Sequence, residues 1–144
     1  MSVNTILVAV RDVDDQQPLL DAVLDVAVPT DASVVLAKAY DEDEYEQRVD
    51  ELDFESKPST DQVAQRSQTI RDAEALLDEA TVEYDVRGVV GEEGDAIVGL
   101  AEAVDPDLLY VQGKGRTPTG KALFGSTAQT ILLNAPCPVT YVRS

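Results

Sequence analysis

Histidine and tryptophan are absent from this 144-residue chain, and cysteine occurs once, as Cys137. Without histidine the chain cannot carry a Ser-His-Asp or Cys-His catalytic arrangement, nor a histidine-bound zinc ion. A single cysteine excludes an internal disulfide and a cysteine-based zinc site. Because no histidine is present to activate it, we expect Cys137 to be a small core residue and not a nucleophile.

Basic residues are scarce. The chain has 11 Lys and Arg against 28 Asp and Glu, which gives a formal net charge of −17. Such a surface repels nucleic acids and anionic membranes, so we expect neither as a partner. The acid excess and the lack of tryptophan favour a halophilic protein, because at about 1 M salt the Debye length falls to ~3 Å and repulsion costs little. An ordinary acidic cytosolic protein is the alternative.

Long hydrophobic runs are also missing, and none approaches the ~20 residues that a membrane-spanning helix needs. The amino-terminal segment has no basic region and no small-residue cleavage pattern, so we expect no signal peptide. The length is typical of one domain that buries its own core. These features together predict a cytoplasmic protein with a single domain over residues 1–144.

Five short apolar runs are present, and each is typical of a strand buried on both faces. They alternate with segments of helical periodicity, which predicts an α/β fold: a doubly wound parallel five-stranded sheet between two layers of helices. A ligand in such a fold lies beyond the carboxyl ends of the strands. The predicted strands are Thr5–Val10, Ser33–Tyr40, Val82–Val90, Leu108–Val111 and Val139–Val142.

The predicted helices follow local start signals. Pro18 suits a first helical turn, and two segments have capping-box spacing, Ser59 with Gln62 and Ser126 with Gln129. We expect one long helix after Ser59 and a short one after Gly94. The acidic stretch 41–59 lacks clear periodicity, so it is predicted to be a solvated, mobile loop, with a lid over a ligand as the alternative.

The segment 111–129 combines a strand end, a glycine-rich loop and a helix start, an arrangement that commonly binds phosphate. No acidic residue follows Asp107, so the last 37 residues are the longest acid-free stretch of the chain. We therefore predict an anion site, with the phosphates of a nucleotide as the expected ligand. Glycines would present backbone N–H groups, hydroxyls would donate hydrogen bonds, and cations would neutralise charge. The candidate residues are Gly113, Lys114, Gly115, Arg116, Gly125, Ser126 and Thr127, with Lys121 as a further cation.

These residues make the whole chain resemble the universal stress protein family. Its hallmark is Gly, two residues, Gly, nine residues, Gly and then Ser or Thr, followed by an Ala-Pro-Cys-Pro-Val ending. Gly115 and Gly125-Ser126 match this spacing, as do residues 135–139 and the opening 6–10.

The resemblance implies a sheet of strand order 3-2-1-4-5, often dimeric through the last strand, here Val139, Thr140, Tyr141 and Val142. It implies an adenine nucleotide, ATP or AMP, with Mg²⁺ as an optional companion. Gly115, Gly125 and Ser126 would hold the phosphates, with Thr127 beside them. Val10 and Ala39 would line the adenine and ribose.

Two positions depart from the family pattern. Gln112 stands where the motif has its first glycine, and Arg11 stands where an acid usually follows the first strand. Three hypotheses remain open. The chain is a nucleotide-binding regulatory protein, or a slow ATPase or phosphoryl-transferase with Asp12 as the candidate metal-holding acid, or a dimeric interaction module with a degenerate site.

Overall fold

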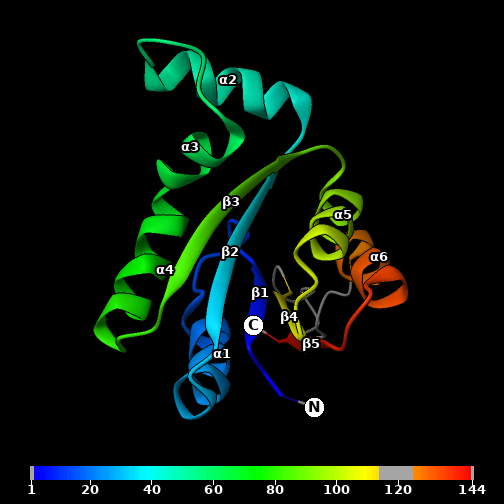
Figure 1. Cartoon of the computed structure of the whole chain (residues 1–144). Coiled ribbons are helices and arrows are strands. Elements are labelled where there is room, and N and C mark those ends of the chain that lie inside the picture. Colours follow the sequence, from blue (N-terminus) through cyan, green and yellow to red (C-terminus); the bar gives the residue numbers. More distant parts are fainter. Residues whose placement is uncertain (1, 114–124, 144) are drawn as a thin grey trace.

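The structure is a computed structural model that describes residues 2–113 and 125–143 (Figure 1). A five-stranded sheet of order β3-β2-β1-β4-β5 forms its centre, and every neighbouring pair of strands is parallel. The order confirms the predicted fold class. The strands are β1 (Thr5–Ala9), β2 (Ser33–Tyr40), β3 (Tyr84–Val90), β4 (Leu108–Gln112) and β5 (Val139–Val142).

Helices cover both faces of the sheet, as Figure 1 shows. Two hydrophobic clusters separate along the strands, because successive side chains point to opposite faces. Leu36 of β2 packs with the helices of one face, and its neighbour Ala37 packs with those of the other. The first face carries α1 (Gln17–Thr30), α3 (Thr60–Gln65) and α4 (Gln68–Glu79), and the second carries α5 (Glu93–Val104) and α6 (Ser126–Asn134).

The prediction of a loop over residues 41–59 was wrong, because this stretch contains helix α2 (Glu42–Leu52). Asp41 caps the helix: its carboxylate accepts from the Glu44 N–H at 2.7 Å, and the Glu44 carboxylate accepts from the Asp41 N–H at 3.3 Å. Acids in the first turn also stabilise the positive end of the helix dipole. Figure 1 shows α2 extending beyond the edge of the sheet, and no α2 residue is fully buried.

Two further helix predictions needed correction. The capping box at Ser59 and Gln62 is confirmed, but the single long helix is divided into α3 and α4 around Arg66 and Ser67. The second capping box, at Ser126, was wrong. Gly125 is the N-cap of α6 and no side chain caps that helix, so Ser126 is its first helical residue.

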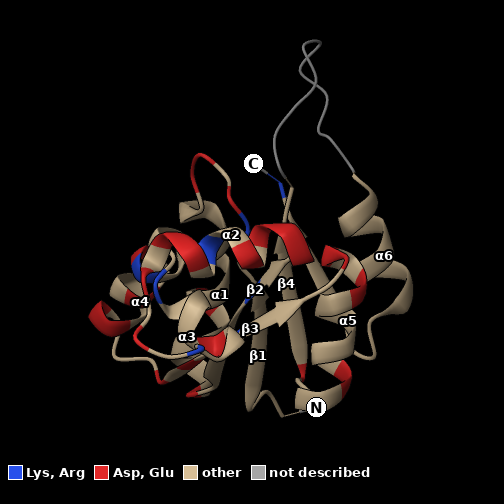
Figure 2. Ribbon diagram, turned by 90° about the horizontal axis from the view of Figure 1, so that it is seen from above, with Lys and Arg blue, Asp and Glu red and all other residues tan. Residues whose placement is uncertain are grey.

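Acidic residues are spread over the outer helices, with the exception of α6, which contains none (Figure 2). Cys137 is partly buried against the α5–α6 cluster, which agrees with its expected role as a small core residue. Within the described residues, no helix has the length and hydropathy to cross a membrane.

Candidate functional site

The carboxyl ends of β1 and β2 open into a pocket of about 240 Å³. Val10 immediately follows β1 and is 2% exposed, and Ala39 lies one residue before the end of β2. Both line this pocket, so the structure brings together the two residues predicted to contact adenine and ribose. The remaining lining residues are Arg11, Asp12, Lys38, Asp41, Glu44, Gly91, Glu92 and Glu93.

Arg11 forms a two-point ion pair with Glu93 across this crevice. Its Nε and Nη2 donate to the Glu93 carboxylate at 3.2 and 3.1 Å, and its Nη1 donates to the Gln112 carbonyl at 3.1 Å. The Arg11 side chain is only 8% exposed. A paired guanidinium in this geometry is held firmly, because charge-assisted bidentate hydrogen bonds are strong. Arg11 therefore links the ends of β1 and β4 to the start of α5.

Glu93 also connects this pair to the last helix. The Thr127 hydroxyl donates to Glu93 Oε1 at 2.9 Å, and Thr127 is 8% exposed. Glu93 and Arg11 are 82 residues apart in sequence. Sequence analysis missed Glu93 because one acid among 28 has no distinguishing local pattern. The only signal was its position in the glycine-flanked turn that leads into α5.

Gln112 lies at the end of β4 and is 1% exposed. Its Nε2 donates to the Asp15 carbonyl at 2.9 Å, while its Oε1 is buried without a hydrogen-bond partner among the described residues. The Gly113 N–H donates to the Val142 carbonyl at 3.0 Å. That amide is therefore engaged in pairing β4 with β5 and does not point freely at an anion, as the loop pattern had suggested.

The start of α6 is open. Gly125 is its N-cap, no side chain caps it, and a Cβ built on Gly125 would meet no atom within 4 Å. The first N–H groups of a helix have no acceptor within the helix and attract anions. Ser126 is exposed at this end, whereas the Thr127 hydroxyl already donates to Glu93. Lys114, Gly115 and Arg116, and with them Lys121, lie outside the described residues.

Asp12 was the candidate metal-holding acid, but it is paired with a cation. Lys38 Nζ donates to Asp12 Oδ1 at 2.7 Å. Partial burial opposes ionisation of Asp12, yet the hydrogen bond and charge of Lys38 outweigh it and lower the pKa of the carboxyl below its ordinary value. Among the described residues, no group of three or more acidic or cysteine side chains lies close enough to hold a metal ion.

Comparison with known proteins places this geometry in context. The model of the universal stress protein family matches residues 2–143. A universal stress protein from Mycolicibacterium smegmatis is 35% identical over 79 residues, a match that spans 54% of this chain and 61% of that relative.

Solved structures cover nearly the whole chain. A crystal structure of a universal stress protein in complex with cAMP is 25% identical with a TM-score of 0.68, over 99% of this chain and 98% of that one. A universal stress protein from Archaeoglobus fulgidus in complex with dAMP is 19% identical with a TM-score of 0.66, over 99% of each chain. The second likeness concerns the fold alone.

Proposed function

Because this chain belongs to the universal stress protein family, we propose that it binds an adenine nucleotide, ATP or AMP, and acts as a cytoplasmic regulatory protein in the response to stress. The observation that carries this proposal is the meeting of Val10 and Ala39 in one pocket at the strand ends. Ligands of such folds usually lie beyond the carboxyl ends of the strands, next to the point where the winding reverses. That point lies here between β1 and β4, and Arg11 connects the pocket to it by donating to the Gln112 carbonyl. A similar protein crystallised in complex with cAMP, which adds support.

The residues present fit a nucleotide at both ends of the crevice. The base and ribose would contact Val10 and Ala39. The phosphates would approach the uncapped start of α6 at Gly125 and Ser126, where the space around Gly125 Cα is open. Lys114, Gly115 and Arg116 would complete the phosphate site, with Thr127 beside it. Binding of an adenine nucleotide would bring negatively charged phosphates to this edge of the sheet, and its release would remove them, so the local charge would change with the bound state.

The Arg11–Glu93 pair gives this site its own character. Arg11 donates hydrogen bonds at a position where an acidic residue would accept them. Its Nη2 donates to Glu93 Oε1 at 3.1 Å. We expect the base and ribose to be bound through backbone groups and apolar contact more than through a side-chain carboxylate at position 11. The regulatory role rests on binding, because no described side chain near Gly125 supplies an unpaired general base for hydrolysis.

The test is the identity of any nucleotide that the purified protein retains, measured by mass spectrometry, followed by titration with ATP and AMP. Gly125→Val should weaken nucleotide affinity by about tenfold or more, because the new side chain fills the space that the phosphates need. Gly99→Val is the matched control, since Gly99 is equally open but lies on the exposed side of α5. Equal affinity of the two variants, or no binding at millimolar nucleotide, would count against the proposal.

A second candidate function is a homodimeric interaction module, with or without nucleotide. It is favoured by the engagement of the Gly113 amide and the Arg11 side chain within the crevice. Strand β5 is an edge of the sheet, and Leu133 of the neighbouring helix α6 is 75% exposed. Edge strands readily pair with a second chain.

Light scattering after size exclusion tests this second function. Thr140→Lys should give a monomer if β5 is the interface, because charge on an edge strand opposes pairing. Val90→Lys is the control, since Val90 is 37% exposed on β3, the opposite edge strand of the sheet. A dimer that persists in Thr140→Lys would exclude pairing through β5.

A further inference from the structure

A second pocket, of about 320 Å³, lies on the opposite side of β2, between the sheet and helices α2, α3 and α4. Its lining holds three of the chain's 11 basic residues, Lys38, Arg48 and Arg66, and a single acid, Asp12. In a protein with more than twice as many acids as bases, this local excess of positive charge is unusual. This pocket shares Asp12 and Lys38 with the crevice described above, but its other lining residues come from β2 and from the segment that contains α2, α3 and α4.

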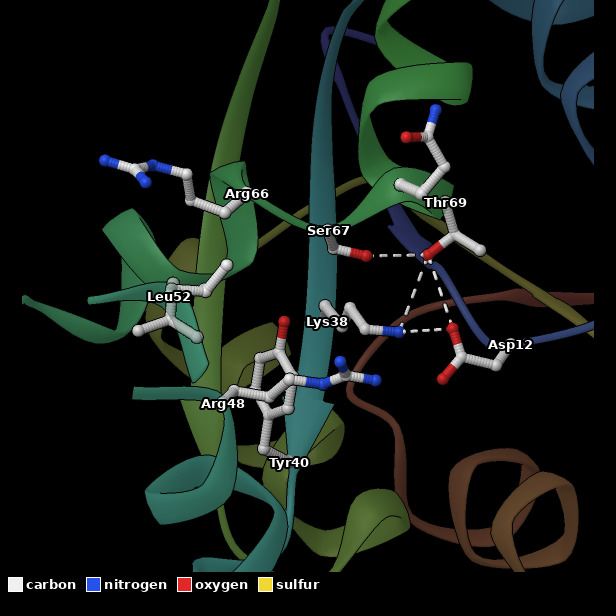
Figure 3. Close-up of a pocket in the computed structure, with 10 residues that line it drawn as sticks. Asp12, Lys38, Tyr40, Arg48, Leu52, Arg66, Ser67 and Thr69 are labelled. Atoms are coloured by element: carbon white, nitrogen blue, oxygen red, sulfur yellow. Dashed lines mark hydrogen bonds and ion pairs between the residues drawn. The ribbon is translucent and has the colours of Figure 1, made fainter. Parts of the chain in front are cut away.

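Two of these cations reach the same space. Figure 3 shows Arg48 extending across the ring of Tyr40 towards Lys38 and Asp12, whereas the guanidinium of Arg66 points away from them. Arg66 instead lies over the ring of Phe54, at 4.7 Å from its centroid. Lys38 is 7% exposed. An ammonium has three N–H donors, and Lys38 uses one on Asp12 at 2.7 Å and directs another at the Thr69 hydroxyl at 3.5 Å.

Helix α4 begins at the wall of this pocket. Ser67 is its N-cap, but the Ser67 side chain makes no capping hydrogen bond and instead contacts the Thr69 hydroxyl at 2.9 Å. Ser67, Gln68 and Thr69 all line the pocket. The N–H groups of this first turn therefore lack a side-chain acceptor, and the positive end of a 12-residue helix lies beside Lys38 and Arg48.

The hydroxyl of Tyr40 is the independent observation that points to a ligand. Tyr40 is 3% exposed, and none of the side-chain hydrogen bonds between described residues involves its hydroxyl. Figure 3 shows this hydroxyl directed into the space between Leu52 and Lys38. Burial raises the pKa of Tyr40 to about 12, so the group remains a hydrogen-bond donor at physiological pH. The fully buried side-chain atoms without a partner among the described residues are Gln16 Oε1 and Gln112 Oε1, so the Tyr40 hydroxyl is reached from the pocket and can donate to a molecule bound there.

We propose that this pocket binds the oxyanion group of a small organic molecule, a phosphate ester or a carboxylate. Lys38, Arg48, the Tyr40 hydroxyl and the first N–H groups of α4 would donate to its oxygens. The volume exceeds that of the oxyanion alone, so the organic part would lie against Leu52 and Val63. The proposal concerns a different pocket from the nucleotide crevice and does not depend on nucleotide binding.

The test is calorimetric titration of the purified protein with inorganic phosphate and, separately, with acetate, at constant potassium chloride. Saturable binding of phosphate supports a phosphate ester, and saturable binding of acetate in its place supports a carboxylate. Arg48→Gln should weaken the binding of the better probe by roughly tenfold, as expected for one lost charge-assisted hydrogen bond. Tyr40→Phe keeps the ring and should weaken it by a smaller factor.

Arg87→Gln is the matched control, because Arg87 is a half-exposed arginine that pairs with Asp61 and does not line the pocket. It should bind the probe as the parent chain does. Arg48 is 56% exposed, so its loss should not prevent folding, which circular dichroism would verify. No saturable binding of either probe, or equal binding by Arg48→Gln and Arg87→Gln, would overturn the proposal. Loss of ATP binding in Arg48→Gln would also overturn it, by making the pocket part of the nucleotide site.

Discussion

The thiol of Cys137 shows how a single residue responds to its surroundings. Burial raises its pKa above the ordinary value, and the carboxylates of Asp105 and Asp107 add to the effect. Because the thiolate is the reactive form, Cys137 should react with a disulfide reagent more slowly at pH 7 than a cysteine in the urea-unfolded chain. The rate should increase as the pH rises. Equal rates for the folded and unfolded chains at pH 7 would contradict this expectation.

Single residues were also where prediction from sequence had least power. The strand-end positions of Val10 and Ala39 could be predicted, because they follow from the apolar runs that define β1 and β2. The partner of Arg11 could not be predicted, because Glu93 lies 82 residues further along the chain, at the start of α5. Contacts of this kind depend on the packing of α5 and not on a local pattern.

Helix α5 contains two glycines in opposite environments, because Gly94 is buried and Gly99 is exposed. A Cβ at Gly94 would lie 2.7 Å from the Cβ of Thr130 on α6, whereas a Cβ at Gly99 would meet nothing within 4 Å. Gly99→Ala should therefore raise the free energy of unfolding by about 0.5–1 kcal/mol through better helix propensity. Gly94→Ala should lower it, because the two helices must separate to admit the methyl group. Urea unfolding of both variants measures the difference, and a stabilised Gly94→Ala would contradict the packing of α5 on α6.

The start of α5 provides a prediction that depends on pH. Backbone N–H groups of Asp95 and Gly94 donate to the Glu92 carboxylate at 2.8 and 3.1 Å and lower the pKa of Glu92 below its ordinary value of 4.5. Because the pKa of Glu92 is lower in the folded state, the charged cap stabilises the fold at a pH above the ordinary pKa of the carboxyl. This stabilisation is lost as the pH falls through the pKa of Glu92 in the folded state. Glu92→Ala should cost about 1 kcal/mol at pH 7, as other N-cap replacements do.

This cost should shrink as the pH falls from 7 towards 3, because protonation weakens the carboxylate as an acceptor. Urea unfolding at each pH measures it, with Glu102→Ala as the control on an exposed position of the same helix. A cost for Glu92→Ala that stays constant down to pH 3 would show that the charge of the cap contributes nothing.

At the scale of elements, the sheet was easier to predict than the helices on the α2–α4 side. All five strands were found within two residues of their observed ends, because each is a distinct apolar run. Helix α2 was missed because its stabilising features are a capping box and a few partly buried side chains, such as Tyr45 and Val49, and not a clear apolar stripe. This omission also concealed the second pocket, since α2 supplies Arg48 and Leu52 to its wall.

The charge of the whole molecule leads to the last prediction. A net charge of −17 on 144 residues, with acids spread over the outer helices (Figure 2), makes the folded state repel itself at low ionic strength. Potassium chloride shortens the Debye length from ~10 Å at about 0.1 M to ~3 Å at about 1 M, so the melting temperature should rise across this range. We infer from this composition that the protein is adapted to high salt.

The variant that tests this inference removes charge where no contact is lost. Asp25, Glu46 and Glu55 are exposed acids without an ion pair among the described residues, and their triple replacement by Asn and Gln removes three negative charges. If repulsion limits stability, this variant should melt at a higher temperature than the parent chain in low salt, and the two should converge towards 1 M. A triple replacement that fails to raise the melting temperature in low salt would contradict the electrostatic explanation, because the charges of these residues would then have no effect on stability at any salt concentration.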